Sequence, residues 1–220
     1  MEQLADLVKQ RRRLERRQHL FRQGDRLESL YVVKSGSLKG YETTADGLEQ
    51  IVGFYFPGEV LGLDGLGARQ HNCAAVALET TVVCELSLIR LVELCEHCPT
   101  LHREMCRIVG NEIAADQDMF LLLAQRSAEE RLATFLLSLS RRFRERGFSE
   151  LDFNLSMTHQ DIASFLGLTP QTLSRLFATF RDEGLINTLH RRVHINDIER
   201  LCKIAKLCVS CPAARQPKAA

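Results

Sequence analysis

The segment from residue 158 to residue 183 constrains the fold of this chain more than any other stretch. Thr158 can cap a first helix, and Gly167 ends its apolar stripe. Thr169 can cap a second helix, and Pro170 suits the first helical position, where its missing N–H costs nothing. Apolar residues then recur at helical spacing at Leu173, Leu176, Phe177 and Phe180. Two short helices around a tight glycine turn predict a helix-turn-helix, with a plain helical hairpin in a larger fold as the alternative.

The second of these helices carries polar and basic side chains near its N-terminal half. With its apolar residues facing inward, the outer or flanking face holds Gln171, Thr172, Ser174, Arg175 and Thr179. A recognition helix meets base edges with this part of its surface when it enters the major groove. The sequence therefore predicts binding to duplex DNA. Residues at the starts of the two helices complete this set of expected DNA contacts, namely Thr158, His159 and Thr169.

A short hairpin follows the predicted reader. Residues 185–189 and 193–195 alternate as two strands around a basic turn at His190, Arg191 and Arg192, a pattern typical of a wing. Residues 127–220 carry 14 Lys and Arg against 10 Asp and Glu, whereas residues 1–126 carry 15 against 18. The basic excess lies where phosphate contacts are expected, so Arg191 and Arg192 join the predicted DNA-binding residues.

The N-terminal part of the chain has short alternating runs separated by glycines. The runs lie at 30–33, 38–41, 50–55, 60–63, 74–78 and 82–86. Their spacing predicts a small antiparallel β-barrel or jelly roll, which we place at residues 1–98. Five arginines between positions 11 and 17 are more typical of the solvated face of a short helix leading into this barrel than of a nucleic-acid site.

From about residue 99 to residue 124 the period becomes helical, with an apolar seam along one long helix. The seam makes this helix a candidate dimer contact through Met105, Ile108, Ile113, Asp116 and Met119. Acidic residues on the seam would bring like charges together across a dimer, so we expect association to be conditional. The sequence thus predicts an α+β protein with a β-roll at 1–98, a dimerisation helix at 99–126 and a winged helix-turn-helix at 127–220.

A β-roll, a long central helix and a winged helix-turn-helix, in this order, resemble the CRP/FNR family of bacterial transcription regulators, whose N-terminal domain is a cyclic-nucleotide-binding-like jelly roll. Short motifs are similar to the FNR branch of anaerobic and redox regulators, among them Glu-Gln-Ile-Val-Gly-Phe at 49–54, Ala-Glu-Glu-Arg-Leu-Ala at 128–133 and Leu-Ser-Arg-Arg-Phe at 139–143. The resemblance implies a homodimer that binds a palindrome of the type TTGAT-N4-ATCAA, recruits RNA polymerase and controls anaerobic or redox-responsive genes.

Readers of this family use a Glu, a Ser and an Arg on the recognition helix, and the matching positions here hold Gln171, Ser174 and Arg175. Arg175 can donate to both O6 and N7 of guanine. Gln171 both donates and accepts, whereas a Glu only accepts, so Gln favours adenine where Glu favours the amino group of cytosine. We expect an altered or relaxed half-site. The loop at 45–48 corresponds to a family activating loop, with Leu48 where an acidic residue is common.

The resemblance also bears on cofactors. The cyclic-nucleotide branch holds the phosphate with Gly-Glu and Arg-Ser; Gly58-Glu59 matches, but His71-Asn72 stands at the second pair, and a neutral imidazole cannot replace a bidentate cation. Oxygen-sensing members hold a [4Fe–4S] cluster with three cysteines before the β-roll and one within it, and only Cys84 matches. A cluster would need other cysteines or a longer natural N-terminus, and a cluster-independent regulator is the alternative.

Two C-x-x-C pairs, Cys95/Cys98 and Cys208/Cys211, have a spacing that suits metal binding or redox chemistry. They lie at opposite ends of the expected architecture, and the cysteines of the β-roll could equally be buried small hydrophobes. No catalytic motif accompanies the seven histidines, so an enzyme is not expected. With neither a long apolar run nor a signal peptide, the sequence predicts a cytoplasmic protein with no membrane partner. A protein-interaction module with a degenerate DNA reader is the remaining alternative.

Overall fold

The structure is a computed structural model that describes residues 8–206. The chain divides into two compact units, Met1–Asp118 and Met119–Ala220, and the division falls inside the long helix α3 (Pro99–Gln125). The domain boundaries expected after residues 98 and 126 remain a prediction. Within the described range, no helix combines the length and the apolar character that crossing a membrane requires.

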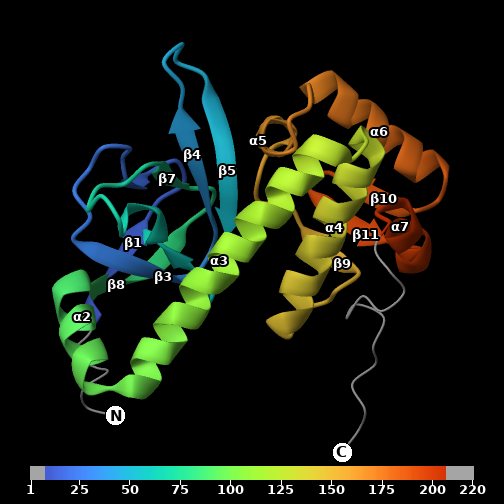
Figure 1. Ribbon diagram of the computed structural model, residues 1–220. Helices are drawn as coiled ribbons and strands as arrows, with labels where there is room; N and C mark the ends of the chain where they lie inside the picture. The colour runs from blue at the N-terminus through green and yellow to red at the C-terminus, as the bar shows by residue number, and fades with distance from the viewer. Residues whose placement is uncertain (1–7, 207–220) are drawn as a thin grey trace, which may run out of the picture. The chain divides into compact units, whose positions relative to one another are not determined.

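Two four-stranded antiparallel sheets form the first unit (Figure 1). Their orders are β1-β8-β3-β6 and β2-β7-β4-β5. The strands are β1 (Val8–Leu14), β2 (His19–Phe21), β3 (Ser29–Ser35), β4 (Leu38–Thr43), β5 (Glu49–Tyr55), β6 (Val60–Leu61), β7 (Ala74–Ala77) and β8 (Thr81–Ser87), with a short 3-10 helix η1 (Leu63–Gly65) after β6. The predicted β-roll is confirmed, and the hairpin of β4 and β5 extends beyond the rest of it (Figure 1).

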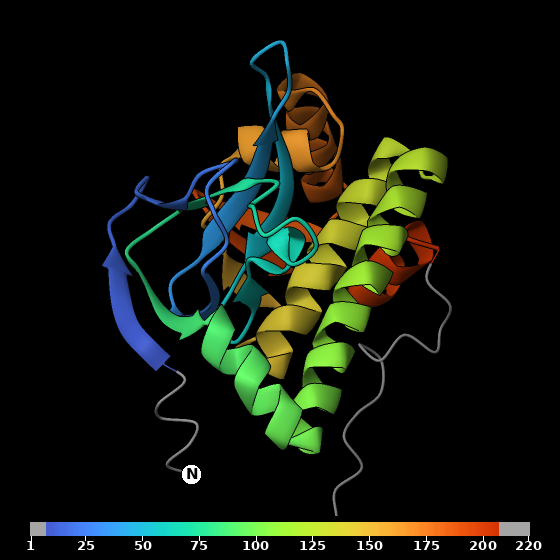
Figure 2. The ribbon, with the colours of Figure 1, turned by 60° about the vertical axis from the view of Figure 1, so that its left-hand side comes forward.

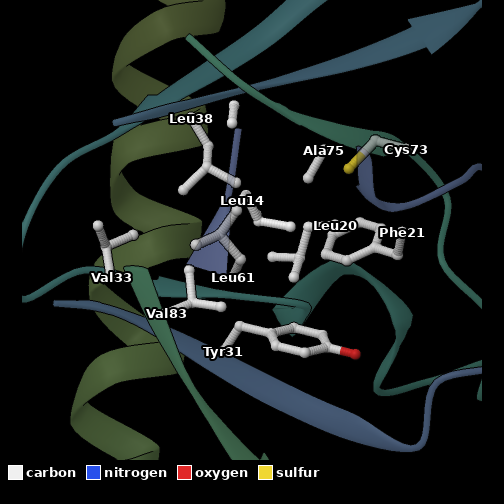
Figure 3. Close-up of a cluster of buried hydrophobic side chains, with 11 residues drawn as sticks. Leu14, Leu20, Phe21, Tyr31, Val33, Leu38, Leu61, Cys73, Ala75 and Val83 are labelled. Atoms are coloured by element: carbon white, nitrogen blue, oxygen red, sulfur yellow. The ribbon is translucent and has the colours of Figure 1, made fainter. Parts of the chain in front are cut away.

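Side chains from both sheets meet in the interior of the roll (Figure 3). One sheet supplies Leu14, Val33, Leu61 and Val83, and the other supplies Leu20, Phe21, Leu38 and Ala75. The alternation that predicted the strands explains this core, because successive side chains of a strand point to opposite faces. On β8, Val83 is buried between the half-buried Val82 and Cys84. Burying one such aliphatic side chain contributes about 1.5–3 kcal/mol.

The prediction of a short helix for the arginine run at residues 11–17 is wrong. Arg11, Arg12 and Arg13 belong to β1, an edge strand that pairs antiparallel with β8 (Figure 2). The strand aligns Arg11 with Cys84 and places Leu14 in the core at 1% exposure. Pairing with the β8 backbone and burial of Leu14 therefore outweigh the helical preference of arginine, which is a weak local effect.

The last strand run ends where expected, at the end of β8, and α2 (Leu88–His97), which was not predicted, follows it directly. Leu91 of α2 forms a small buried cluster with Leu27 and Leu30 of the roll. Partly buried residues of α2 and of the first turns of α3 pack against this cluster, including Leu94, Cys95, Leu101 and Met105. The long helix predicted from residue 99 is confirmed, and this cluster attaches its N-terminal part to the first unit.

The second unit is the predicted winged helix-turn-helix. Its elements are α4 (Ala128–Glu145), β9 (Asp152–Asn154), α5 (His159–Phe165), α6 (Pro170–Asp182), β10 (Ile186–Leu189), β11 (Arg192–Ile195) and α7 (Ile198–Ile204). The strands form an antiparallel sheet in the order β10-β11-β9. Ser127 caps α4 by accepting a hydrogen bond from the Glu130 N–H. Leu132 and Leu136 of α4 are completely buried, so α4 supports the unit from inside.

Candidate DNA-binding interface

Both helices of the reader begin at the predicted caps. The Thr158 hydroxyl accepts from the Asp161 N–H at 3.1 Å, and the Asp161 carboxylate accepts from the Thr158 N–H at 2.9 Å, which makes a capping box at the start of α5. The Thr169 hydroxyl accepts from the Thr172 N–H at 3.1 Å, with Pro170 at the first position of α6. Short-range signals in the sequence thus fix where each helix starts.

The turn between α5 and α6 is held by a side chain from α4. Gly167 adopts a φ of 62°, in the left-handed region where glycine is favoured. The Arg131 guanidinium donates to the Leu166 carbonyl at 2.9 Å and to the Leu123 carbonyl at 2.8 Å. One arginine therefore binds backbone carbonyls at the ends of both α3 and α5 and fixes the reader against the last turn of α3. Sequence analysis gave no sign of this contact.

Helix α6 separates an apolar face from a polar one. Leu173 is completely buried, and Leu176, Phe177 and Phe180 are buried beside it. Gln171, Ser174 and Arg175 are exposed, as is Thr179, while Thr172 is half-buried. Of the exposed residues, the first three lie in the N-terminal half of the helix, as the sequence predicted. In the part of the chain that the structure describes, no hydrogen bond or ion pair engages the Arg175 guanidinium.

His159 has a structural contact as well as an exposed edge. Its ring stacks on Phe177 of α6, with centroids 4.8 Å apart and an interplanar angle of 14°. Burial lowers the pKa of His159, and the positive charge of Arg181 lowers it further. The imidazole therefore joins α5 to α6, and its neutral form is the one that this site favours.

The wing is the hairpin of β10 and β11, with Ile186 opposite Ile195. His190 lies in its turn with a φ of 54°, and Arg191 is exposed beside it. Arg192 makes a bidentate ion pair with Asp152 of β9, both N–O distances being 2.6 Å. The hydrogen bond to Arg192 lowers the pKa of Asp152. Of the two predicted wing contacts, Arg192 is thus already occupied by a carboxylate, whereas Arg191 donates a long hydrogen bond, 3.4 Å, to the Ser156 carbonyl.

The predicted dimer residues of α3 fall into two groups. Met105, Ile108 and Met119 are half-buried, and Met105 packs against the cluster of Leu27, Leu30 and Leu91 in its own chain. Ile113 and Asp116 are exposed. Phe120, which sequence analysis did not select, is 71% exposed and lies seven residues after Ile113, on the same helical face. Its i,i+7 spacing from Ile113 was the available signal.

In the β-roll, the Asp64 carboxylate lies beside His71, where a cyclic-nucleotide site would need a residue that binds phosphate. His71 is 3% exposed, and its ring lies on Phe21 with centroids 3.6 Å apart. Its Nδ1 is 3.6 Å from Asp64 Oδ1. Burial acts to raise the pKa of Asp64, but His71 and the N–H groups of Asn72 and Cys73 hold it below its usual value. An ionised carboxylate beside a buried imidazole is a poor environment for an anion.

The cysteines do not assemble a metal site in the described part of the chain. Cys84 is half-buried on β8, on the face opposite Val83, and Cys95 and Cys98 lie at the end of α2. Residues 8–206 contain no group of three His, Cys, Asp or Glu side chains arranged to hold a metal ion. A [4Fe–4S] cluster needs about four soft donors, so these residues do not fit one. Cys208 and Cys211 lie outside the described residues.

A β-roll followed by a long helix and a winged reader with an exposed polar face defines a DNA-binding transcription regulator. The sequence matches the cyclic nucleotide-binding domain over residues 11–98 and the Crp-like helix-turn-helix domain over residues 130–204. The chain belongs to the CRP/FNR family of transcription regulators, and its relatives named below are regulators rather than enzymes.

Two regulators and one solved structure illustrate the similarity. The chain is 46% identical over 205 residues to the transcriptional activator protein Anr of Pseudomonas aeruginosa. The matched region covers 93% of this chain and 84% of Anr. It is 42% identical over 205 residues to the fumarate and nitrate reduction regulatory protein of Escherichia coli, covering 93% and 82%. The structure of FixK2 from Bradyrhizobium japonicum matches with a TM-score of 0.82 at 28% identity, over 90% of this chain and 98% of FixK2.

Proposed function

We propose that this protein acts as a homodimer that reads an FNR-type palindrome through α6 and controls anaerobic or redox-responsive genes. The proposal rests on one observation. Gln171, Ser174 and Arg175 are exposed on the polar face of α6, whereas its apolar face is buried. The Arg175 guanidinium, which no residue from 8 to 206 engages, can donate to O6 and N7 of one guanine. The names of the two relatives, an activator and a regulator of fumarate and nitrate reduction, support the anaerobic role.

A two-fold-symmetric dimer would suit a palindromic DNA site. Two copies of α6 in one dimer would enter successive major grooves on one side of the duplex, so their half-sites would lie roughly 34 Å apart. Helix α3 offers the surface for such a dimer, because Ile113 and Phe120 are exposed on one of its faces. Each half-site would then be read once by Gln171, Ser174 and Arg175.

An electrophoretic mobility-shift assay with TTGAT-N4-ATCAA and scrambled DNA tests the proposal. Arg175→Ala is expected to remove about 1–3 kcal/mol of preference for the palindrome, because the bidentate guanine contact is lost. Arg141→Ala, a change to an exposed arginine on α4, is the matched control and should bind like the wild type. If Arg175→Ala and Arg141→Ala bind the palindrome equally well, α6 is not the reader.

The alternative of a protein-interaction module with a degenerate reader differs in its salt dependence. A DNA reader that neutralises several phosphates loses affinity steeply as salt rises. Repeating the mobility shift at increasing salt therefore separates the two functions. A weak affinity that is the same for every DNA sequence would favour the interaction module.

We infer that the regulator works without a cyclic nucleotide and without a cluster held by residues 8–206. The acidic Asp64 beside His71 would repel the phosphate of a cyclic nucleotide, and Glu59 already accepts a hydrogen bond from the Phe56 N–H at 3.0 Å. Iron analysis and visible absorption after anaerobic purification test the second point. A stoichiometric iron–sulfur chromophore in the full chain would overturn the inference about the cluster. Calorimetry with cyclic AMP tests the inference about the cyclic nucleotide.

We also propose that the β4–β5 hairpin contacts RNA polymerase. Leu48 is 68% exposed in its turn, where the Thr44 N–H donates to the Leu48 carbonyl at 2.9 Å and the Thr44 hydroxyl accepts from the Leu48 N–H at 3.2 Å. An apolar side chain at this tip suits an apolar partner surface. In transcription reconstituted with purified polymerase, Leu48→Asp should reduce transcript yield while operator binding is retained, and equal yields would argue against the contact.

A further inference from the structure

The link between α3 and α4 consists of only two residues, Arg126 and Ser127. Ser127 is extended, with a φ of −65° and a ψ of 163°, so the backbone leaves its helical path there. Each residue of such a link keeps two soft backbone dihedrals, so chain continuity alone would let the end of α3 swing relative to the reader. Further contacts are needed to hold the last turn of α3 at one angle to α5 and α6.

The side chain of Arg131 supplies directional contacts across this link. Its Nε donates to the Arg126 carbonyl at 3.0 Å, and its Nη2 donates to the Leu123 carbonyl at 2.8 Å. Its Nη1 donates to the Leu166 carbonyl, at the end of α5, at 2.9 Å. Three nitrogens of one planar group thus bind three carbonyls from two helix ends. Because hydrogen bonds weaken when their angles change, these contacts resist a change in the angle between α3 and α5.

The α5–α6 turn lies close to both Arg131 and α3. Leu166 is completely buried, and Gly167 follows it with a φ of 62°. A Cβ atom added to Gly167 would lie 3.4 Å from Nη1 of Arg131 and 3.6 Å from Cδ2 of Leu123. The absence of a side chain at Gly167 therefore lets the turn approach the arginine and the last turn of α3. The reader is placed by this approach as well as by the hydrogen bonds.

The end of α3 also carries part of the surface proposed for the dimer. Phe120 is 71% exposed, and it lies in the same compact unit as the reader, which begins at Met119. Leu123 follows Phe120 by three residues, which is about 4.5 Å along the helix. Arg131 thus fixes the reader to a piece of α3 that would meet a second chain. In a dimer, the same contact would fix each copy of α6 relative to the two-fold axis.

We propose that Arg131 is a positioning residue that sets the half-site spacing accepted by the dimer, an inference that rests on the DNA-reading dimer proposed above. One additional base pair between the half-sites rotates one of them by about 34° and moves it by about 3.4 Å, since one turn of about 34–36 Å holds about 10.5 base pairs. A binding site tolerates displacements of only about 10–20° and about 0.5 Å. A reader held at one angle therefore rejects the longer spacer, whereas a loosened reader adapts to it.

Dissociation constants for TTGAT-N4-ATCAA and TTGAT-N5-ATCAA test the proposal. The wild type should bind the N5 site at least about tenfold more weakly than the N4 site, and Arg131→Ala should reduce this ratio to about threefold or less. Arg131→Lys keeps the positive charge but offers one nitrogen in place of three, so its ratio should fall as well. A loss of stability lowers the amount of folded protein equally for both DNAs. The ratio therefore reports positioning and not folding.

Lys206→Ala is the matched control. The Lys206 Nζ lies 2.7 Å from Oε1 of Glu130, the neighbour of Arg131 on α4, and among residues 8–206 its side chain is hydrogen-bonded to neither α3 nor α5. Its spacing ratio should equal that of the wild type. An unchanged ratio in both Arg131 variants would overturn the proposal, and so would an equal fall in Lys206→Ala, because the ratio would then follow any contact of α4.

The same measurements distinguish this proposal from the one on which it rests. A wild type that binds the N4 palindrome no better than scrambled DNA would refute the proposed DNA reader itself. A wild type that prefers the N4 palindrome to scrambled DNA, but binds the N4 and N5 sites equally, would leave the reader intact and refute the role of Arg131 in spacing.

Discussion

We expect residue 171 to set which base the reader prefers beside the guanine expected for Arg175. Gln171 is exposed one residue inside α6, so its amide can both donate to and accept from a base edge. In Gln171→Glu the side chain can only accept hydrogen bonds. We therefore expect its base preference to move from adenine toward cytosine by about 1–3 kcal/mol. Relative dissociation constants for all single-base variants of TTGAT measure the change. An identical preference in both proteins would show that residue 171 does not contact a base.

Arg192 shows how one neighbour can restrain a basic side chain. Its guanidinium is held by Asp152 through two hydrogen bonds of 2.6 Å, so the wing presents less positive charge than its sequence suggests. Asp152→Asn should release Arg192 to a phosphate and steepen the slope of log K against log salt by about one. The double variant with Arg192→Ala should lose this gain. If the steeper slope persists without Arg192, the released arginine is not its cause.

At the scale of single elements, sequence reasoning succeeded where the controlling contacts are local. Thr158 and Thr169 cap N–H groups three residues away, and Leu173 to Phe180 repeat with the helical period, so each signal lies within one or two turns. Prediction from sequence failed where the contact joins residues that are far apart along the chain. The arginines of β1 pair with β8 about seventy residues later, and Arg131 reaches Leu166 across 35 residues. The tertiary partners of such groups leave no trace in neighbouring residues.

The junction of α5 and α6 should be sensitive to pH. Burial lowers the pKa of His159 in the folded protein, so the unfolded chain binds a proton more readily than the folded one. The stability from this histidine is therefore present above its unfolded pKa, about 6.5, and is lost as pH falls through the lower folded value. Comparing urea midpoints of wild type and His159→Phe at pH 8 and pH 5 should show the wild type losing stability relative to the variant at pH 5. An unchanged difference would contradict this reasoning.

At the scale of the whole molecule, we expect two chains to meet through the exposed face of α3. Ile113 is 53% exposed and Phe120 is 71% exposed, and seven residues bring them onto the same side of the helix. Asp116 lies between them on this side, while Asp118 points elsewhere because it is five residues from Ile113. A two-fold axis near this face would bring the two Asp116 carboxylates together, which opposes the apolar attraction of Ile113 and Phe120.

Sedimentation equilibrium can separate these two effects. Burying a phenyl ring contributes about 1.5–3 kcal/mol, and a dimer would bury two, so Phe120→Ala should raise the dimer dissociation constant by at least about a hundredfold. Asp116→Ala should lower the constant, because it removes like charges from the interface, and added salt should lower the wild-type constant by screening the same repulsion. Asp118→Ala is the matched control on the same helix and should leave the constant unchanged. If Asp116→Ala and Asp118→Ala behave alike, the two chains meet through a different face of α3.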